Sequence, residues 1–116
     1  MHNYAFWHLF TGSSFVEFSS PVFVDFPVKL TCRWAKNGDA DVTWYRSKGQ
    51  EQEKLKTENQ DCKEKSCFAV FNILSAKIPD SAKYYCVVST TKFYEAKTLN
   101  VTGNHFIIPL KKVLYC

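Results

Sequence analysis

Apolar and polar residues alternate with a period of two through the middle of the chain. The clearest stretch is residues 28–34, where polar side chains separate Val28, Leu30, Cys32 and Trp34. Successive side chains of an extended strand point to opposite sides, so this pattern predicts a strand with one buried face and one polar face. Directly after it, Asn37-Gly38-Asp39 indicates a turn.

Further strands are predicted on both sides of this segment. They cover residues 15–26, 42–46, 68–74, 82–88 and 94–102. Ser19-Ser20-Pro21 splits the first of these into one or two edge strands, while Leu99 and Val101 point inward in the last. No stretch shows the 3.6-residue period of an amphipathic helix and no internal repeat occurs, so the sequence predicts an all-β domain.

Residues 48–65 differ in composition from the rest of the chain. Five lysines and five acidic residues fall in this stretch, and Leu55 and Cys62 are its only apolar residues. Because so little of it can be buried, we expect a solvated edge and loop. Its charges cancel, so the net charge of +4 comes from other parts of the chain.

The length of 116 residues and the hydrophobic fraction of 46% fit one domain with its own core. We place that domain at residues 15–102, between an N-terminal segment (1–14) and a C-terminal tail (103–116). Five cysteines in a short chain indicate an oxidising compartment, with two bridges and one sulfur left over. The longest basic run is Lys111-Lys112, so we do not expect nucleic-acid binding.

Two interpretations fit residues 1–14. Residues 4–10 are apolar and aromatic, but His8 interrupts them and no Lys or Arg precedes them, as a secretory signal would require. The segment is therefore either a signal remnant or an N-terminal extension of the mature protein. No stretch approaches about 18 apolar residues, so we expect any membrane anchor of the natural protein to lie outside this chain.

A group of residues with separate structural roles points to a family. Cys32 and Trp44 fall on consecutive predicted strands, and Cys86 ends the run Asp80-Ser81-Ala82-Lys83-Tyr84-Tyr85-Cys86. This order resembles the immunoglobulin superfamily, and the run looks like strand F of a variable domain. The resemblance covers residues 15–102. It implies a sandwich of two antiparallel sheets, similar to the variable-type or shortened variable-type domains of leukocyte immune receptors.

The resemblance also implies a role for each of these residues. A Cys32–Cys86 disulfide would join the two sheets, and Trp44 would pack against it. Tyr84 would form a tyrosine corner by returning its hydroxyl to the backbone near Asp80. Asp80 would pair with a basic residue, for which the candidates are Arg46, Lys63 and Lys65.

Two departures from a full variable domain narrow the interpretation. Cys32 and Cys86 are 54 positions apart, which is short, so we expect strand C″ and much of strand C′ to be reduced. Tyr94-Glu95-Ala96-Lys97 stands where rearranged antigen-receptor chains carry a Phe-Gly-x-Gly bulge. This second departure argues against a rearranged receptor chain.

The remaining three cysteines allow more than one arrangement. Cys62 and Cys67 are close enough in sequence for a local disulfide that ties down the charged segment, which resembles the extra bridge of several leukocyte receptors. Free thiols or a pairing with Cys116 are the alternatives. A zinc site is not favoured, because no second cysteine pair has matching spacing. Cys116 either links two chains or has no partner because the chain ends there.

Nothing in the sequence favours catalysis. The histidines are His2, His8 and His105, and all of them lie outside the predicted core. They form no nucleophile–base set, and the four glycines are scattered singly rather than forming a phosphate-binding loop. We therefore expect no enzymatic activity, no cofactor and no metal site.

A binding surface is predicted on the sheet that contains strands G, F and C of the expected sandwich, and on the F–G loop at its end, residues 90–94, whose tip carries Phe93 and Tyr94. Its candidate partner-binding residues are Tyr45, Tyr85, Val87, Phe93 and Tyr94. Tyrosines bury a large area and keep a polar tip, which suits an interface. Asn100-Val101-Thr102 is an acceptor triplet for N-glycosylation, and Asn100 is expected to point outward.

The resemblance implies a non-catalytic recognition domain of an immune receptor, extracellular and either on the cell surface or secreted. Its expected partner is a protein ligand or a second immunoglobulin-like chain, in a homo- or heterodimer that Cys116 could link. The alternatives are a variable region like that of a T-cell receptor, a homophilic adhesion module, or a truncated product without activity of its own.

Overall fold

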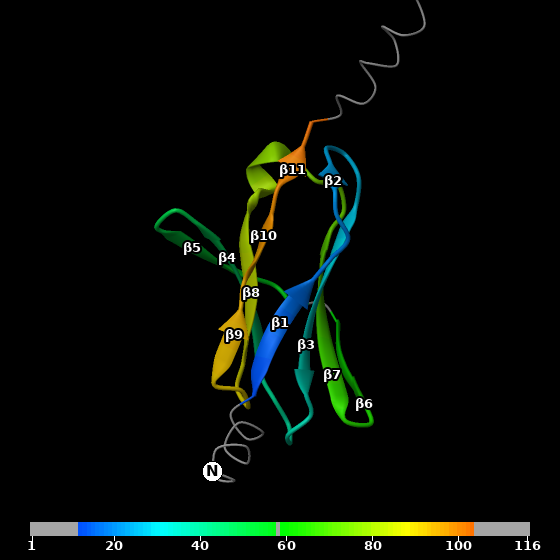
Figure 1. Ribbon diagram of the computed structural model, residues 1–116, viewed down its shortest axis with the longest axis vertical. Coiled ribbons are helices and arrows are strands. Elements are labelled where there is room, and N and C mark those ends of the chain that lie inside the picture. Colours follow the sequence, from blue (N-terminus) through cyan, green and yellow to red (C-terminus); the bar gives the residue numbers. More distant parts are fainter. Residues whose placement is uncertain (1–11, 58, 104–116) are drawn as a thin grey trace, which may run out of the picture.

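Two β-sheets pack face to face in the computed structural model, which describes residues 12–57 and 59–103 (Figure 1). The expectations for the N-terminal segment up to residue 11, the three histidines, the tail from residue 104 and Cys116 lie outside the described residues. The strands are β1 Ser13–Glu17, β2 Val22–Phe23, β3 Val28–Ala35, β4 Val42–Lys48, β5 Glu51–Leu55, β6 Asn59–Lys63, β7 Ser66–Ile73, β8 Ala82–Val88, β9 Phe93–Glu95, β10 Lys97–Leu99 and β11 Val101–Thr102. One 3-10 turn, η1, covers Ile78–Asp80.

The first sheet has the strand order β6-β7-β3-β1-β9 and the second has the order β10-β8-β4-β5, while β11 and β2 form a separate pair. Strand pairing is antiparallel except for β1 with β9 and β2 with β11, which are parallel. The prediction of an all-β sandwich is therefore confirmed, with two short parallel pairs that the sequence did not indicate.

Alternation along the central strands builds the core between the sheets. In β3 the four predicted apolar positions are buried, and in β8 Ala82, Tyr84, Cys86 and Val88 are buried. Each of these strands thus points every second side chain into the space between the sheets, as expected for two sheets whose side chains interdigitate. The predicted third strand ends one residue early, because β7 stops at Ile73 and Leu74 is exposed.

The charged segment is more regular than predicted. It is exposed as expected, but it contains β5 and β6 instead of an irregular loop. β5, which stands in the place of strand C′, pairs along its full length with β4, so the expected reduction of strand C′ is wrong. β6 pairs with β7. Both strands lie at sheet edges, where backbone pairing is satisfied on one side and charged side chains remain in water.

The last predicted strand is divided into three. β9 pairs with β1, β10 pairs with β8, and β11 pairs with β2, so this stretch connects the two sheets. Leu99 and Val101 are buried, as predicted. At the other end, β1 begins at Ser13, two residues before the expected domain start, and the buried Ser14 hydroxyl donates to the Cys86 carbonyl at 2.9 Å.

Candidate binding surface

The centre of the sandwich contains the predicted disulfide between Cys32 in β3 and Cys86 in β8, whose Cα atoms are 6.3 Å apart. Trp44 in β4 is the Cα partner of Cys86 on the neighbouring strand, and its side chain is fully buried. Its ring centroid lies 6.1 Å from that of Phe71. These residues hold the sheets together and leave no surface for a ligand.

A polar network closes one end of this core. The Tyr84 hydroxyl donates to the Asp80 carbonyl at 2.6 Å, and Arg46 Nη1 donates to that hydroxyl and to Asp80 Oδ1, both at 3.3 Å. A second carboxylate, that of Glu53, binds Arg46 Nη2 at 2.5 Å. Arg46 is therefore the basic partner of Asp80, because the pairing of β4 with β8 places it directly opposite Tyr84.

The surroundings of this network shift two pKa values. Burial raises the pKa of Tyr84 above its ordinary value, although the hydrogen bond from Arg46 opposes the shift. Burial alone would lower the pKa of Arg46, but its hydrogen bonds to Glu53 and Tyr84 raise it overall. Both side chains keep their ordinary protonation state at neutral pH, so the network is structural.

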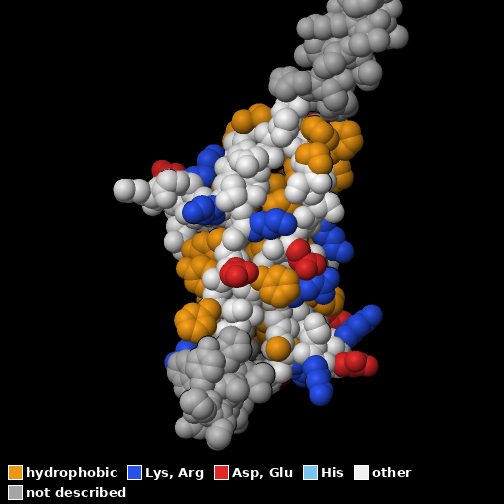
Figure 2. Space-filling view, viewed as in Figure 1, with side chains coloured by type: hydrophobic (Ala, Val, Ile, Leu, Met, Phe, Trp, Pro, Cys, Tyr) orange, Lys and Arg blue, Asp and Glu red, His pale blue; other side chains and the backbone are white. Residues whose placement is uncertain are grey.

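Three tyrosines stack on the outer face of the β10-β8-β4-β5 sheet, and we call them the tyrosine cluster. Tyr45 in β4 and Tyr85 in β8 are Cα partners, with ring centroids 5.3 Å apart. Tyr94 in β9 covers the other side of Tyr85, with centroids 4.5 Å apart and planes inclined by 13°. Figure 2 shows hydrophobic side chains gathered on the side of the molecule where β8 and β9 lie.

The exposure of this cluster differs from the prediction at one residue. Val87 and Tyr94 are 38% and 50% exposed, as a contact surface requires. Tyr85 is only 8% exposed, so its expected exposure is wrong. Tyr85 is buried because the rings of Tyr45 and Tyr94 stack against it. This burial, together with the neighbouring phenols Tyr94 and Tyr45, raises the pKa of Tyr85.

Phe93 does not join the tyrosine cluster, although the sequence grouped it with Tyr94. The two residues are neighbours in β9, so their side chains point to opposite sides of the strand. Phe93 is the Cα partner of Ser13 and is 57% exposed. The sequence placed Phe93 at the tip of a loop, whereas it begins strand β9. The parallel pairing of β9 with β1, which orients Phe93, has no local sequence signal.

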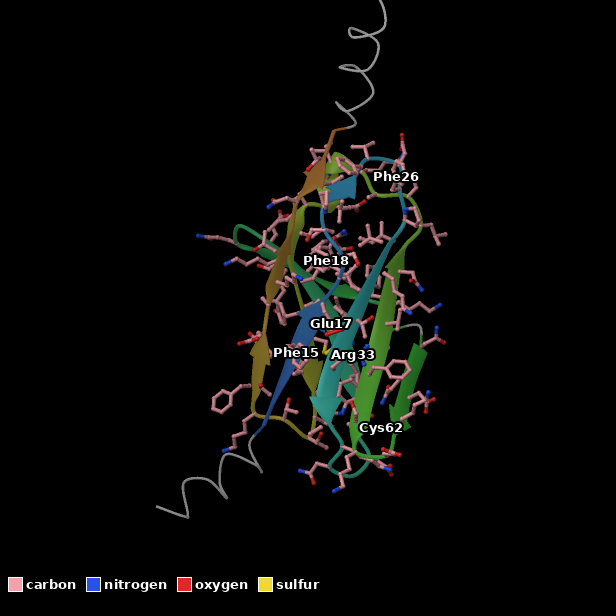
Figure 3. The ribbon with its side chains drawn as sticks, turned by 45° about the vertical axis from the view of Figure 1, so that its right-hand side comes forward. Phe15, Glu17, Phe18, Phe26, Arg33 and Cys62 are labelled. Carbon is pink, nitrogen blue, oxygen red and sulfur yellow. A yellow bond between two sulfur atoms is a disulfide. The ribbon has the colours of Figure 1, made fainter. Side chains whose placement is uncertain are left out.

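The outer face of the other sheet is of mixed character. Figure 3 shows Phe15, Glu17 and Arg33 on β1 and β3, and Arg33 Nε donates to Glu17 Oε1 at 2.9 Å. Phe15 in β1 and Phe68 in β7 lie on either side of Arg33 on this face, so a charged pair separates its aromatic rings, whereas the rings of the tyrosine cluster stack on one another.

Charge on the outer face of the β10-β8-β4-β5 sheet is of one sign. Its paired positions are Thr43, Tyr45, Ser47, Gln52, Lys54, Lys83, Tyr85, Val87 and Thr98. No carboxylate is among them, and Lys54 and Lys83 are both exposed. The acidic side chains of β5, Glu51 and Glu53, alternate with these residues and point to the opposite side.

Cys62 and Cys67 form a second disulfide at the bottom of the first sheet, where Figure 3 labels Cys62. They are Cα partners in β6 and β7, and Cys67 is buried against the core. The bridge thus ties the charged edge strand β6 to the sandwich. Asn100 and Thr102 of the acceptor triplet are both exposed, on either side of the buried Val101.

Within residues 12–57 and 59–103, no three His, Cys, Asp or Glu side chains gather so that they could hold a metal ion. Nor does any helix among these residues have the length and apolar character of a membrane span.

Comparison with known proteins agrees with the fold. The family model described as Immunoglobulin domain matches residues 20–98. That match includes both core cysteines, Trp44 and most of the strands described above. No curated protein matches the chain.

Proposed function

The chain belongs to the immunoglobulin domain family, and on that premise we propose that it is the recognition domain of an immune receptor, on the cell surface or secreted. Immunoglobulin domains are generally non-catalytic binding modules and typically extracellular. We propose that this one binds a protein ligand through the tyrosine cluster and Val87. The two disulfides support an extracellular location, because such bonds persist in oxidising compartments.

The observation that carries this proposal is the stacked arrangement of Tyr45, Tyr85 and Tyr94 on an otherwise polar sheet face. Stacking fixes the rings before a partner arrives, so little side-chain entropy remains to be lost on binding. Half of Tyr94 and over a third of Val87 remain exposed for contact. Rigid aromatic residues of this kind are typical centres of protein interfaces.

The charge of this face favours a different protein over a second copy of the chain. Lys54 and Lys83 flank the tyrosine cluster, and the paired positions of the face include no acidic residue. Two copies meeting through it would bring cations together, whereas an acidic surface would be attracted. We therefore propose a protein ligand that presents carboxylates around an apolar centre.

Topology supports a shortened variable-type domain. A constant-type sandwich has three strands in the sheet with strand F, and a variable-type sandwich adds two more. Here β5 is added beside β4, β8 and β10, and the following strand β6 belongs to the other sheet. The sequence Tyr94-Glu95-Ala96-Lys97, in place of Phe-Gly-x-Gly, supports an innate receptor over a rearranged antigen-receptor chain.

A binding screen against extracellular domains of cell-surface proteins tests this proposal. The oxidised domain is the probe, and the chain offers a matched pair of variants, Tyr94→Ala and Phe93→Ala. Both residues are similarly exposed neighbours in β9, but only Tyr94 belongs to the tyrosine cluster. We expect Tyr94→Ala to weaken the selected interaction at least about tenfold and Phe93→Ala to leave it within about twofold.

The same screen distinguishes the alternatives. Charge reversal by Lys54→Glu with Lys83→Glu should slow association and reduce the dependence of the association rate on salt. Equal loss with Phe93→Ala and Tyr94→Ala, or no loss with either, would refute binding through this face. Self-association of the wild-type domain in sedimentation, abolished by Tyr94→Ala, would replace the receptor proposal with homophilic adhesion.

A further inference from the structure

We propose that Asn100 carries an N-linked glycan that covers the β10 edge of the outer sheet face beside Lys83. The residues Asn100-Val101-Thr102 form the acceptor triplet for this modification. A short triplet occurs often by chance, so the proposal rests on how the fold presents these three residues.

The triplet has the geometry of a usable site. Asn100 lies between β10 and β11, and it and Thr102 are exposed while Val101 between them is buried. The Val101 amide donates to the Ser81 hydroxyl at 2.9 Å, which fixes the backbone with both acceptor side chains outward. A sugar on the Asn100 side chain would therefore displace no core residue.

The chemistry needs a donor that the oxidising secretory pathway supplies, a lipid-linked oligosaccharide pyrophosphate. In the transfer, the bond between sugar C1 and the pyrophosphate oxygen breaks and a bond from C1 to the Asn100 amide nitrogen forms. The amide nitrogen gives up one proton, which passes to water, and the lipid pyrophosphate leaves with the electron pair of the broken C1–oxygen bond. The two disulfides of the domain are consistent with passage through the same compartment.

Strand register determines which part of the face the glycan would cover. Thr98 in β10 is the Cα partner of Lys83 in β8, and Asn100 is about 7 Å further along the same side. From Lys83, β8 continues in the opposite direction to Tyr85 and Val87. Lys54 lies on β5, which is three strands from β10, or about 14 Å across the sheet, and it is level with Tyr85 rather than with Asn100.

The glycan would therefore shield Lys83 and leave Lys54 and the far end of the tyrosine cluster open. If the tyrosine cluster is the binding site, as proposed above, a partner approaches from the Val87 and Tyr94 side. This last step rests on the proposed function, while the glycan and its position do not.

Expression of the chain in a mammalian secretory system tests the modification first. We expect the intact mass to fall on treatment with a glycan-releasing amidase, and peptide mapping to locate the resulting carboxyl at position 100. Asn100→Gln and Thr102→Ala should abolish the mass shift, and Thr102→Ser should retain it. A secreted wild-type domain of unmodified mass would overturn the proposal.

Lysine acetylation by limiting acetic anhydride tests the position. We expect Lys83 to react several-fold more slowly in the glycosylated domain than in Asn100→Gln, and Lys54 to react equally in both. Equal reaction of Lys83 in the two proteins would overturn the proposed placement. Neither readout uses a binding partner, so either result is independent of whether Tyr94→Ala weakens ligand binding.

Discussion

The ring of Tyr85 stacks on that of Tyr94, with centroids 4.5 Å apart and planes inclined by 13°. Tyr85 belongs to β8 of one sheet, whereas Tyr94 belongs to β9, which is hydrogen-bonded to β1 of the other. The contact therefore links the two sheets outside the core. It explains why one residue of the candidate binding surface is buried while its neighbour remains half exposed.

Replacement of Tyr85 should consequently cost stability as well as binding. We expect Tyr85→Ala to lower the free energy of unfolding by about 3 kcal/mol, because it removes a buried ring with contacts on both sides. Tyr45→Ala should cost about 1 kcal/mol, since it removes a partly exposed ring that, among the rings of the described residues, stacks on Tyr85 alone. Urea denaturation at neutral pH measures both, and equal losses for the two variants would contradict this account.

The core could be predicted from the sequence because its signal is local. Alternation alone identifies Leu30, Cys32 and Trp34 as inward residues, and the same rule identifies Tyr84 and Cys86. These positions require only that each strand be extended with one side facing the other sheet. The order of Cys32, Trp44 and Cys86 then specifies how the strands are shared between two sheets.

The candidate surface could be predicted only in part, because its details depend on register between distant strands. The stacking of Tyr94 on Tyr85 requires β9 to follow β1, which no local pattern indicates. The choice of Arg46 over Lys63 and Lys65 as the partner of Asp80 depends on the pairing of β4 with β8. Lys63, by contrast, lies on β6 in the other sheet.

The tyrosine corner predicts a hydrogen-bond effect that can be isolated. Tyr84→Phe removes the donor to the Asp80 carbonyl and the acceptor for Arg46 while keeping the buried ring. We expect it to lower the free energy of unfolding by about 1–2 kcal/mol, because a partly buried carbonyl and part of a guanidinium lose a partner. Tyr45→Phe is the matched control and should change the free energy by less than about 0.5 kcal/mol.

Alkaline pH should destabilise the domain through its buried tyrosines. The pKa values of Tyr84 and Tyr85 are raised in the folded state, chiefly by burial, above the value of about 10 in the unfolded chain. The folded state then holds more protons than the unfolded state once the pH passes about 10, so the free energy of unfolding falls as pH rises further. Below that pH this contribution to stability is fully present.

Urea denaturation between about pH 8 and pH 11 measures this effect. The variant with Tyr84→Phe and Tyr85→Phe should lose less stability across this range than the wild type, although it starts from a lower value. Parallel curves for the two proteins would show that other groups cause the alkaline loss.

The two disulfides should contribute unequally, because the loops that they close differ in length. Cys32 and Cys86 are 54 positions apart, and Cys62 and Cys67 are 5 apart. In the chain-entropy model, removal of the first bridge costs about 4 kcal/mol and removal of the second about 2 kcal/mol. We therefore expect Cys62→Ala with Cys67→Ala to keep the fold with a lower urea midpoint, and Cys32→Ala with Cys86→Ala to be largely unfolded at 37 °C. Alanine serves as the replacement because Cys67, Cys32 and Cys86 are buried among apolar side chains. An equal loss of stability in the two double variants would contradict the dependence on loop length.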